Sequence, residues 1–193
     1  MTTLLFLASL AMAQDQPAAA VGTHSGVSGL VLARPFTLAQ PATFFWVKEQ
    51  PSYDAGWLVV VRVDPELIRP RQVGVPVLYA GTTPVELLND GYPSGVAIGL
   101  VPASVDLEHA PIFFGPTTLP ERVDAAYGTE VLATAKARGF AGPSATAWTA
   151  ARTAGGSPLR VDDRGDLQHQ VADLIDAYAP SEHERAERYR LTP

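Results

Sequence analysis

Four histidines and twenty aspartate and glutamate residues are among the side chains of this sequence that could bind a metal ion or transfer a proton. Their densest group in the middle of the chain is Asp106, Glu108 and His109. Carboxylate oxygens and an imidazole nitrogen are suitable ligands for a divalent cation. A solvated loop before the apolar residues 111–114 explains the same pattern. We therefore expect a loop here and keep the three residues only as weak metal candidates.

Motifs that define common catalytic sites are missing from the sequence. His183 and Glu184 lack the second histidine of a zincin, and no nucleophile elbow surrounds Ser94. The aspartates within residues 162–166 do not have EF-hand spacing, and capping of a helix explains them better. The absence of cysteine excludes thiol catalysis, iron–sulfur clusters and cysteine-based zinc sites. The sequence thus predicts no cofactor.

The composition and charge of the chain exclude some classes of binding partner. The chain has 193 residues, of which 47% are apolar, and its 14 basic and 20 acidic residues give a net charge of −6. One hydrophobic core fits this length. No basic cluster is present to bind phosphates, so we expect no nucleic-acid partner. No apolar run reaches the length of about 20 residues that a transmembrane helix needs.

The first residues resemble an export signal. Residues 4–10 are apolar except for Ser9, and the small residues Ala11 and Ala13 fit signal-peptidase cleavage before Gln14, although no basic residue precedes the apolar run. We therefore expect a signal peptide at 1–13, a flexible segment at 14–24, and a periplasmic or secreted protein. A retained hydrophobic segment that docks on a partner, or on the protein itself, is the alternative.

The middle of the chain has many prolines, which favour short strands. Twelve of the 17 prolines lie between Pro35 and Pro120, and proline is excluded from helix interiors and central strand positions. The intervening runs are rich in β-branched and aromatic residues. We expect a mainly β fold, an antiparallel β-sandwich or open barrel of about seven short strands. The predicted strands are residues 27–32, 43–48, 56–63, 75–80, 85–88, 95–101 and 111–114.

A helix near 118–138 completes this domain, which we place at residues 25–138. Thr118 and Glu121 have the spacing of a capping box, Gly128 interrupts the helical pattern, and Gly139 is suited to end the helix. Residues 139–159 are small and flexible in composition and are predicted to be a linker. Trp148 has no explanation in such a linker, because a side chain of that size is usually buried.

The tail, residues 160–193, is predicted to form an amphipathic helix. An apolar stripe at helical spacing lies within residues 167–178, and Asp173 and Asp176 lie on the other side. A stripe of this kind must be buried, so the helix folds back on the sandwich or docks on another protein or a second copy of the chain. Its acidic polar face disfavours an anionic membrane surface. The predicted docking face is Leu167, Val171, Leu174, Ile175 and Tyr178.

These features favour an exported, non-catalytic binding or assembly module, such as a peripheral subunit of a cell-envelope complex. The alternative is a hydrolase or metal-dependent enzyme whose active site is assembled from dispersed residues, with Asp106, Glu108 and His109 as candidates. A polar cleft that holds a histidine or a carboxylate pair would favour the enzyme. A smooth sandwich with an exposed apolar patch would favour the binding module.

Overall fold

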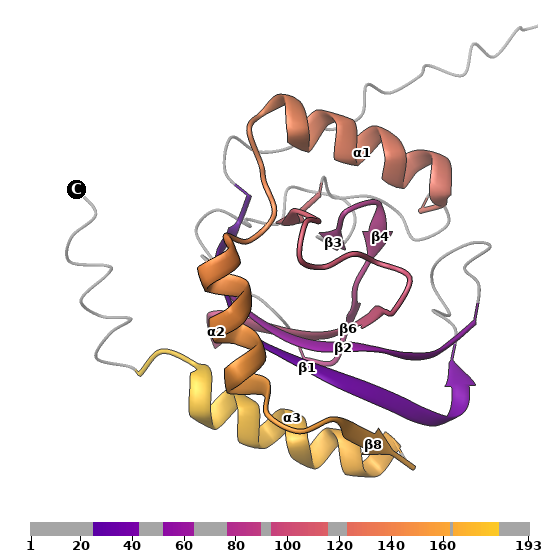
Figure 1. Ribbon diagram of the computed structural model, residues 1–193, viewed down its shortest axis with the longest axis vertical. Coiled ribbons are helices and arrows are strands. Elements are labelled where there is room, and N and C mark those ends of the chain that lie inside the picture. Colours follow the sequence, from indigo (N-terminus) through magenta and orange to yellow (C-terminus); the bar gives the residue numbers. More distant parts are fainter. Residues whose placement is uncertain are drawn as a thin grey trace, which may run out of the picture.

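Figure 1 shows the computed structural model, which describes residues 25–42, 52–63, 77–89, 94–115, 123–162 and 164–181. Within these ranges the chain is mainly β, with a five-stranded sheet, a three-stranded sheet and three helices. The predicted β-sandwich with C-terminal helices is confirmed. Several predicted features lie outside the described residues: the signal peptide at 1–13, the segment 14–24, the strand at 43–48 and the capping box of Thr118 and Glu121.

The larger sheet has the strand order β5-β6-β2-β1-β8. All of its neighbouring strands are antiparallel except β1 and β8, which pair in parallel. Its strands are β1 (Val27–Ala42), β2 (Tyr53–Val63), β5 (Glu86–Leu87), β6 (Val96–Pro102) and β8 (Leu159–Val161). The smaller sheet has the order β4-β3-β7, from β3 (Leu78–Ala80), β4 (Thr83–Pro84) and β7 (Ile112–Phe114).

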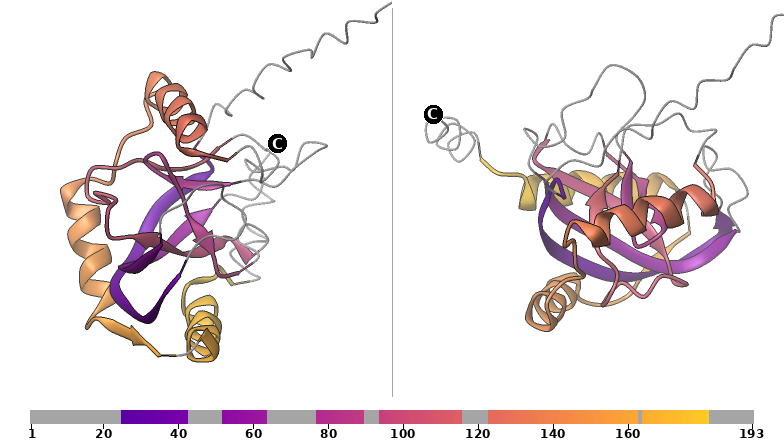
Figure 2. Two further views of the ribbon diagram at one scale, coloured as in Figure 1. Left: turned by 90° about the vertical axis from the view of Figure 1, so that its right-hand side faces the viewer. Right: turned by 90° about the horizontal axis from the view of Figure 1, so that it is seen from above.

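The side chains buried on each face of the large sheet show how the layers of the fold are arranged. Leu58 and Val60 of β2 belong to a cluster on one face of the large sheet, and Val59 and Val61 belong to a cluster on the other. Both faces of β2 are therefore covered, as its uninterrupted apolar run predicts. The second cluster includes Leu78 and other residues of the small sheet, so the two sheets pack face to face. Figure 2 (left) shows α1 and α3 on opposite sides of these sheets.

β1 continues well beyond residue 32, where the sequence predicted its end. It runs through Pro35 and Pro41, and Pro35 pairs with Trp57 of β2. The pairing with β8 on the other edge covers only Phe36 to Leu38. Pro35 thus lies where β1 has β2 as its single strand neighbour among the described residues, a position that tolerates proline better than one between two strands.

Helix α1 (Ala125–Ala137) starts later than predicted and covers the outer face of the small sheet. Its N-cap is Asp124, whose carboxylate accepts a 2.8 Å hydrogen bond from the Tyr127 N–H. Gly139 follows the helix with φ 82°, which confirms its predicted role at the C-terminus. Gly128 does not break α1: a β-carbon there would lie 2.2 Å from the Thr82 carbonyl oxygen, so the glycine permits close helix–sheet packing.

The predicted linker at 139–159 instead contains helix α2 (Ala145–Gly155) and the first residue of β8. The Ser144 hydroxyl caps α2 by accepting from the Ala147 N–H. Trp148 and Ala151 are buried in the cluster between the sheets. Gly155 allows α2 to approach β1 closely, since a β-carbon there would lie 2.3 Å from the Ala33 carbonyl oxygen. A composition of small residues reflects close packing here, not a flexible connection.

Candidate functional site

Helix α3 (Arg164–Tyr178) carries the predicted docking face, and the structure divides this stripe into two parts. Leu167 and Val171 are 6% and 7% exposed, within the cluster that α3 shares with the large sheet. Leu174, Ile175 and Tyr178 pack against the same cluster but are only half-buried. The helix thus lies on the chain's own sheet, which is one of its two expected positions. Contact with a partner stays a prediction.

Arg34 of β1 fixes one side of this helix. Its Nε donates a 2.7 Å hydrogen bond to the Ser157 carbonyl, in the connection between α2 and β8. Its Nη1 donates a 3.2 Å hydrogen bond to Oε1 of Gln170 in α3. These two bonds bring β1, the α2–β8 connection and α3 together at one place.

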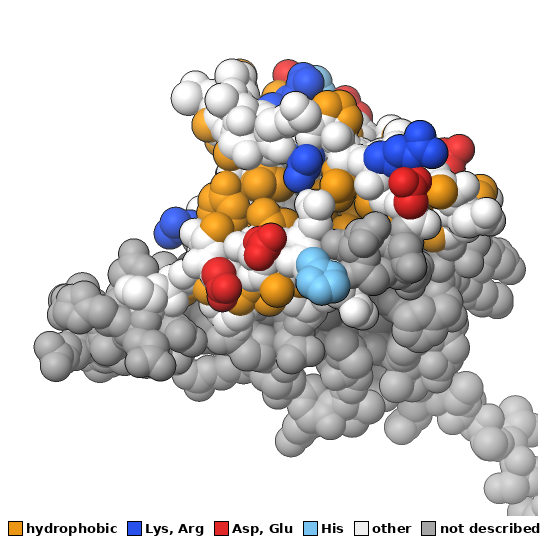
Figure 3. All heavy atoms as spheres, turned by 90° about the horizontal axis from the view of Figure 1, so that it is seen from below, with side chains coloured by type: hydrophobic (Ala, Val, Ile, Leu, Met, Phe, Trp, Pro, Cys, Tyr) orange, Lys and Arg blue, Asp and Glu red, His pale blue; other side chains and the backbone are white. Residues whose placement is uncertain are grey.

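An apolar patch lies exposed beside this junction. Figure 3, viewed from the α3 side, shows hydrophobic side chains gathered on this face, with acidic side chains and a histidine along one border and basic side chains along others. The outer side of α3 carries the exposed residues His169, Asp173 and Asp176. We define the α3 patch as the half-buried apolar residues of α3 together with one residue of β1 that packs on the same cluster: Val31, Leu174, Ile175 and Tyr178.

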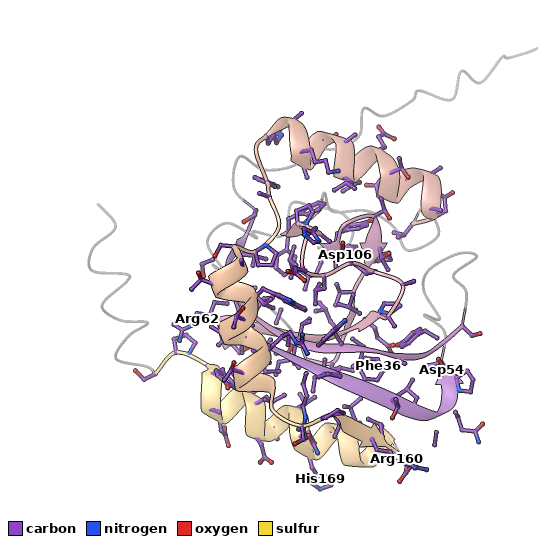
Figure 4. All side chains as sticks on the ribbon, viewed as in Figure 1. Phe36, Asp54, Arg62, Asp106, Arg160 and His169 are labelled. Atoms are coloured by element: carbon purple, nitrogen blue, oxygen red, sulfur yellow. The ribbon has the colours of Figure 1, made fainter. Side chains whose placement is uncertain are left out.

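The weak metal candidates lie on a different part of the molecule. His109 Nδ1 and Asp106 Oδ2 are 2.8 Å apart, in the predicted loop before β7, and these side chains are 75% and 71% exposed. Glu108 is also exposed. Figure 4 places Asp106 near the small sheet and His169 at the outer side of α3, well apart. In the described part of the chain, no three His, Asp or Glu residues are grouped to hold a metal ion.

Glu86 is a carboxylate whose burial the sequence did not reveal. It is 7% exposed, the one buried charged side chain of the described residues, and the Tyr53 hydroxyl donates a short hydrogen bond to its Oε2. The only signal was a single acidic residue within the apolar run 85–88. The bond links the start of β2 to β5 at the edge of the sheet. Burial of a hydrogen-bonded carboxylate in this way gives it a structural role.

A cation–π cluster covers one side of α2. The Trp57 and Trp148 rings meet edge to face, with their centroids 5.2 Å apart. The Arg152 guanidinium carbon lies 5.4 Å from the Trp57 ring and 5.9 Å from the Trp148 ring. Both distances are within the range for cation–π attraction. This cluster holds α2 on the sheet.

A cavity of about 310 Å³ lies beside the start of β1. Its lining combines the hydroxyls of Ser25 and Ser28 with the apolar side chains of Leu30, Ile112 and Phe140. None of the lining residues is charged, so the cavity presents no side-chain acid or base. Its chemistry fits an uncharged ligand group better than a reaction.

Compared with known proteins, the chain matches no family model, no curated protein and no solved structure. In the described ranges, no helix is both long enough and apolar enough to cross a membrane. The fold therefore defines the class of this protein, a β-sandwich with helices on its outer faces.

Proposed function

We propose that this chain is an exported, non-catalytic binding or assembly module that docks through the α3 patch. One observation carries the proposal: the apolar stripe of α3 extends beyond what its own sheet buries. Leu167 and Val171 are buried against the sheet, whereas Leu174, Ile175 and Tyr178 pack on the same cluster and leave part of their apolar surface at the exterior. Apolar residues that are contiguous on a surface and bordered by charges are typical of protein-binding sites.

Residues in the first half of α3 attach the helix to the sheet and so hold the α3 patch in a fixed position. Arg34 holds the helix through Gln170, and Val171 is buried one residue further along the chain. A binding face mounted on a fixed helix loses little conformational entropy on association. The arrangement is suited to recognition of a protein surface.

Export is the second part of the proposal. It is supported by the apolar residues 4–10 and the small residues at positions 11 and 13, all outside the described part of the chain. Mass spectrometry of the full chain expressed in a bacterial host should find a mature protein that begins at Gln14. An Ala13→Arg variant should keep its first residues. An unprocessed wild-type chain in the cytoplasm would contradict export.

Docking is tested with two substitutions on α3. Leu174→Gln places a polar group in the patch, whereas Ala172→Gln makes a matched change at an exposed position on another side of the helix. The immobilised wild-type chain and the Ala172→Gln variant should retain a protein partner or a second copy, and Leu174→Gln should lose it. Circular dichroism checks that all three are folded. Equal retention by the three proteins would overturn the proposal.

A further inference from the structure

The cavity of about 310 Å³ lies at an edge of β1, on the side away from β2. Its described lining consists of residues 25–30, Ile112 at the start of β7, and residues 139–143, which connect α1 to α2, with no residue of β2. β8 pairs with β1 only from Phe36 to Leu38. In the part of the chain that the structure describes, the first half of β1 therefore has no strand neighbour on the side of the cavity.

The direction of the main-chain groups in this part of β1 follows from its pairing with β2. The Val63 N–H of β2 donates to the Gly95 carbonyl on the β6 side, and these directions alternate from residue to residue along a regular strand. Val61 therefore also faces β6, and Val61 is the residue opposite Leu30. In such a non-hydrogen-bonded pair, both residues direct their main-chain groups away from each other. The N–H and C=O of Leu30 thus point away from β2, toward the cavity.

The outward-facing residues before and after Leu30 are already covered. At Val27, the Ser25 hydroxyl accepts a 3.2 Å hydrogen bond from the main-chain N–H and donates one of 2.8 Å to the carbonyl. At Ala33, helix α2 lies so close that a β-carbon at Gly155 would come within 2.3 Å of the carbonyl oxygen. Between these points, no described residue forms a hydrogen bond to the outward main-chain groups of Leu30. The cavity therefore presents one donor and one acceptor from the same residue.

The remaining lining residues define what pairs with Leu30. They include the hydroxyl of Ser28 and the apolar side chains of Ile112 and Phe140, and none of them is charged. An ion would lose part of its hydration there without meeting a counter-charge, so the lining selects an uncharged group. A donor and an acceptor on one strand residue match the main chain of an extended peptide that adds to a sheet edge. A compact space of this volume is roughly 7 Å across, or about two residues at about 3.3 Å per residue.

We propose that the cavity beside β1 binds an extended, uncharged peptide segment, whose main chain pairs with Leu30 and whose apolar side chain lies against Ile112. Paired residues of neighbouring strands direct their side chains to the same face, and Leu30 and Ile112 pack on the same cluster. The site is separate from the α3 patch, because Val31 of that patch packs on the cluster of the opposite face. The inference adds a second recognition site and does not rest on docking through α3.

NMR of the backbone amides of the full-length chain tests this site, with the blocked tripeptide acetyl-Thr-Leu-Thr-amide as the probe. The probe should shift the signals of Leu30 and Phe140 with a Kd of about 1 mM, as is typical of so small a contact. A methyl group on the leucine nitrogen of the probe removes the N–H that pairs with the Leu30 carbonyl. This methylated probe should bind about tenfold more weakly. A probe with aspartate in place of leucine should also bind more weakly, since the lining offers no counter-charge.

Two substitutions at Leu30 separate its main-chain N–H from its side chain. Leu30→Pro removes the outward N–H, and the same strand already accommodates Pro35 at an outward-facing position, opposite Trp57. Leu30→Val keeps the N–H and has a side chain close to proline in size. The proline variant should bind the probe about five- to tenfold more weakly than the valine variant. Circular dichroism checks that both variants are folded.

Several outcomes would overturn the proposal. They are the absence of amide shifts in the wild type at about 10 mM probe, equal binding of the methylated and unmethylated probes, and shifts confined to α3. Equal or tighter binding of an uncharged sugar, methyl glucoside, at the same amides would overturn a peptide as the occupant. If Leu30→Pro does not fold, the methylated probe and the wild type still decide.

Failure at this cavity is distinguishable from failure of docking through the α3 patch. Leu174→Gln changes the α3 patch and should bind the tripeptide with the same Kd as the wild type. A weaker Kd for Leu174→Gln would overturn the separation of the two sites. Loss of tripeptide binding in Leu30→Pro, with capture of a protein partner through α3 retained, supports two separate sites.

Discussion

Trp57 of β2 and Trp148 of α2 meet edge to face, with ring centroids 5.2 Å apart and ring planes at 68°. The contact joins a central strand to the segment whose composition predicted a linker. Trp148 is 7% exposed, and Arg152 lies over both rings. This long-range contact explains how a sequence of small residues forms a fixed helix on the sheet.

Trp148→Ala should therefore destabilise the whole domain. Loss of a buried tryptophan removes its apolar burial and leaves a cavity, which costs about 3 kcal/mol or more in the free energy of unfolding. Urea denaturation followed by circular dichroism measures the change. Thr149→Ala, at the next and exposed position, should change the free energy of unfolding by less than about 0.5 kcal/mol. A denaturation midpoint unaffected by Trp148→Ala would restore the linker interpretation.

For the substitution Gly128→Ala, helix propensity and packing have opposite effects on stability. Replacing glycine by alanine inside an exposed helix stabilises it by about 1 kcal/mol. A β-carbon at Gly128 would lie 2.2 Å from the Thr82 carbonyl oxygen, so α1 must shift away from the turn between β3 and β4. Overpacking of this kind costs about 1–3 kcal/mol, and backbone cannot move aside as easily as a side chain.

We therefore expect Gly128→Ala to lower the melting temperature, despite its favourable propensity. Differential scanning calorimetry measures the effect. Ala126→Gly, at an exposed position of the same helix, reports the propensity change alone and should cost about 1 kcal/mol. A Gly128→Ala variant more stable than the wild type would mean that α1 does not approach Thr82 this closely.

The sequence predicted the strands better than the elements around them. β2 and β6 could be found because proline, glycine and polar residues bound an apolar run, which is a local signal. α2 and β8 were missed because their stability comes from partners distant in sequence, Trp57 for Trp148 and β1 for β8. No local pattern encodes a parallel pairing of three residues.

The residues of the candidate site could likewise be predicted only in part from the sequence. The helical spacing identified the apolar stripe of α3, but not which of its residues the sheet would bury. Arg34 gave no signal, since its position beside α3 depends on the bond with Gln170, a residue in a distant segment. The burial of Glu86 likewise became visible only through the hydroxyl of Tyr53.

Tyr79 of β3 is buried without a hydrogen bond for its hydroxyl. The residue is fully buried and stacks on Phe113, with ring centroids 5.7 Å apart. Its Oη has no hydrogen-bond partner in the described part of the chain. An unsatisfied buried hydroxyl costs about 1–3 kcal/mol, and removing it relieves that cost while the ring keeps its packing. Tyr79→Phe should therefore raise the free energy of unfolding at pH 7 by about 1 kcal/mol.

The same hydroxyl predicts how stability changes in alkali. Burial raises the pKa of the Tyr79 phenol well above its ordinary value, because the phenolate would lose its hydration, and Tyr127 raises it further. In the unfolded chain the phenol ionises near pH 10. Below that pH both states keep the proton, and above it only the folded state does. The wild type should then lose about 1.4 kcal/mol of unfolding free energy per pH unit through this group.

Tyr79→Phe has no phenol to ionise at this position. The difference in unfolding free energy between the two proteins should therefore change only in alkali. Urea denaturation at pH 7, 9 and 11 measures the difference in unfolding free energy, in which the other tyrosines cancel. That difference should be constant from pH 7 to 9 and then grow in favour of the variant by about 1.4 kcal/mol between pH 9 and 11. A wild type that follows Tyr79→Phe in parallel up to pH 11 would mean that the Tyr79 hydroxyl reaches water in the folded protein.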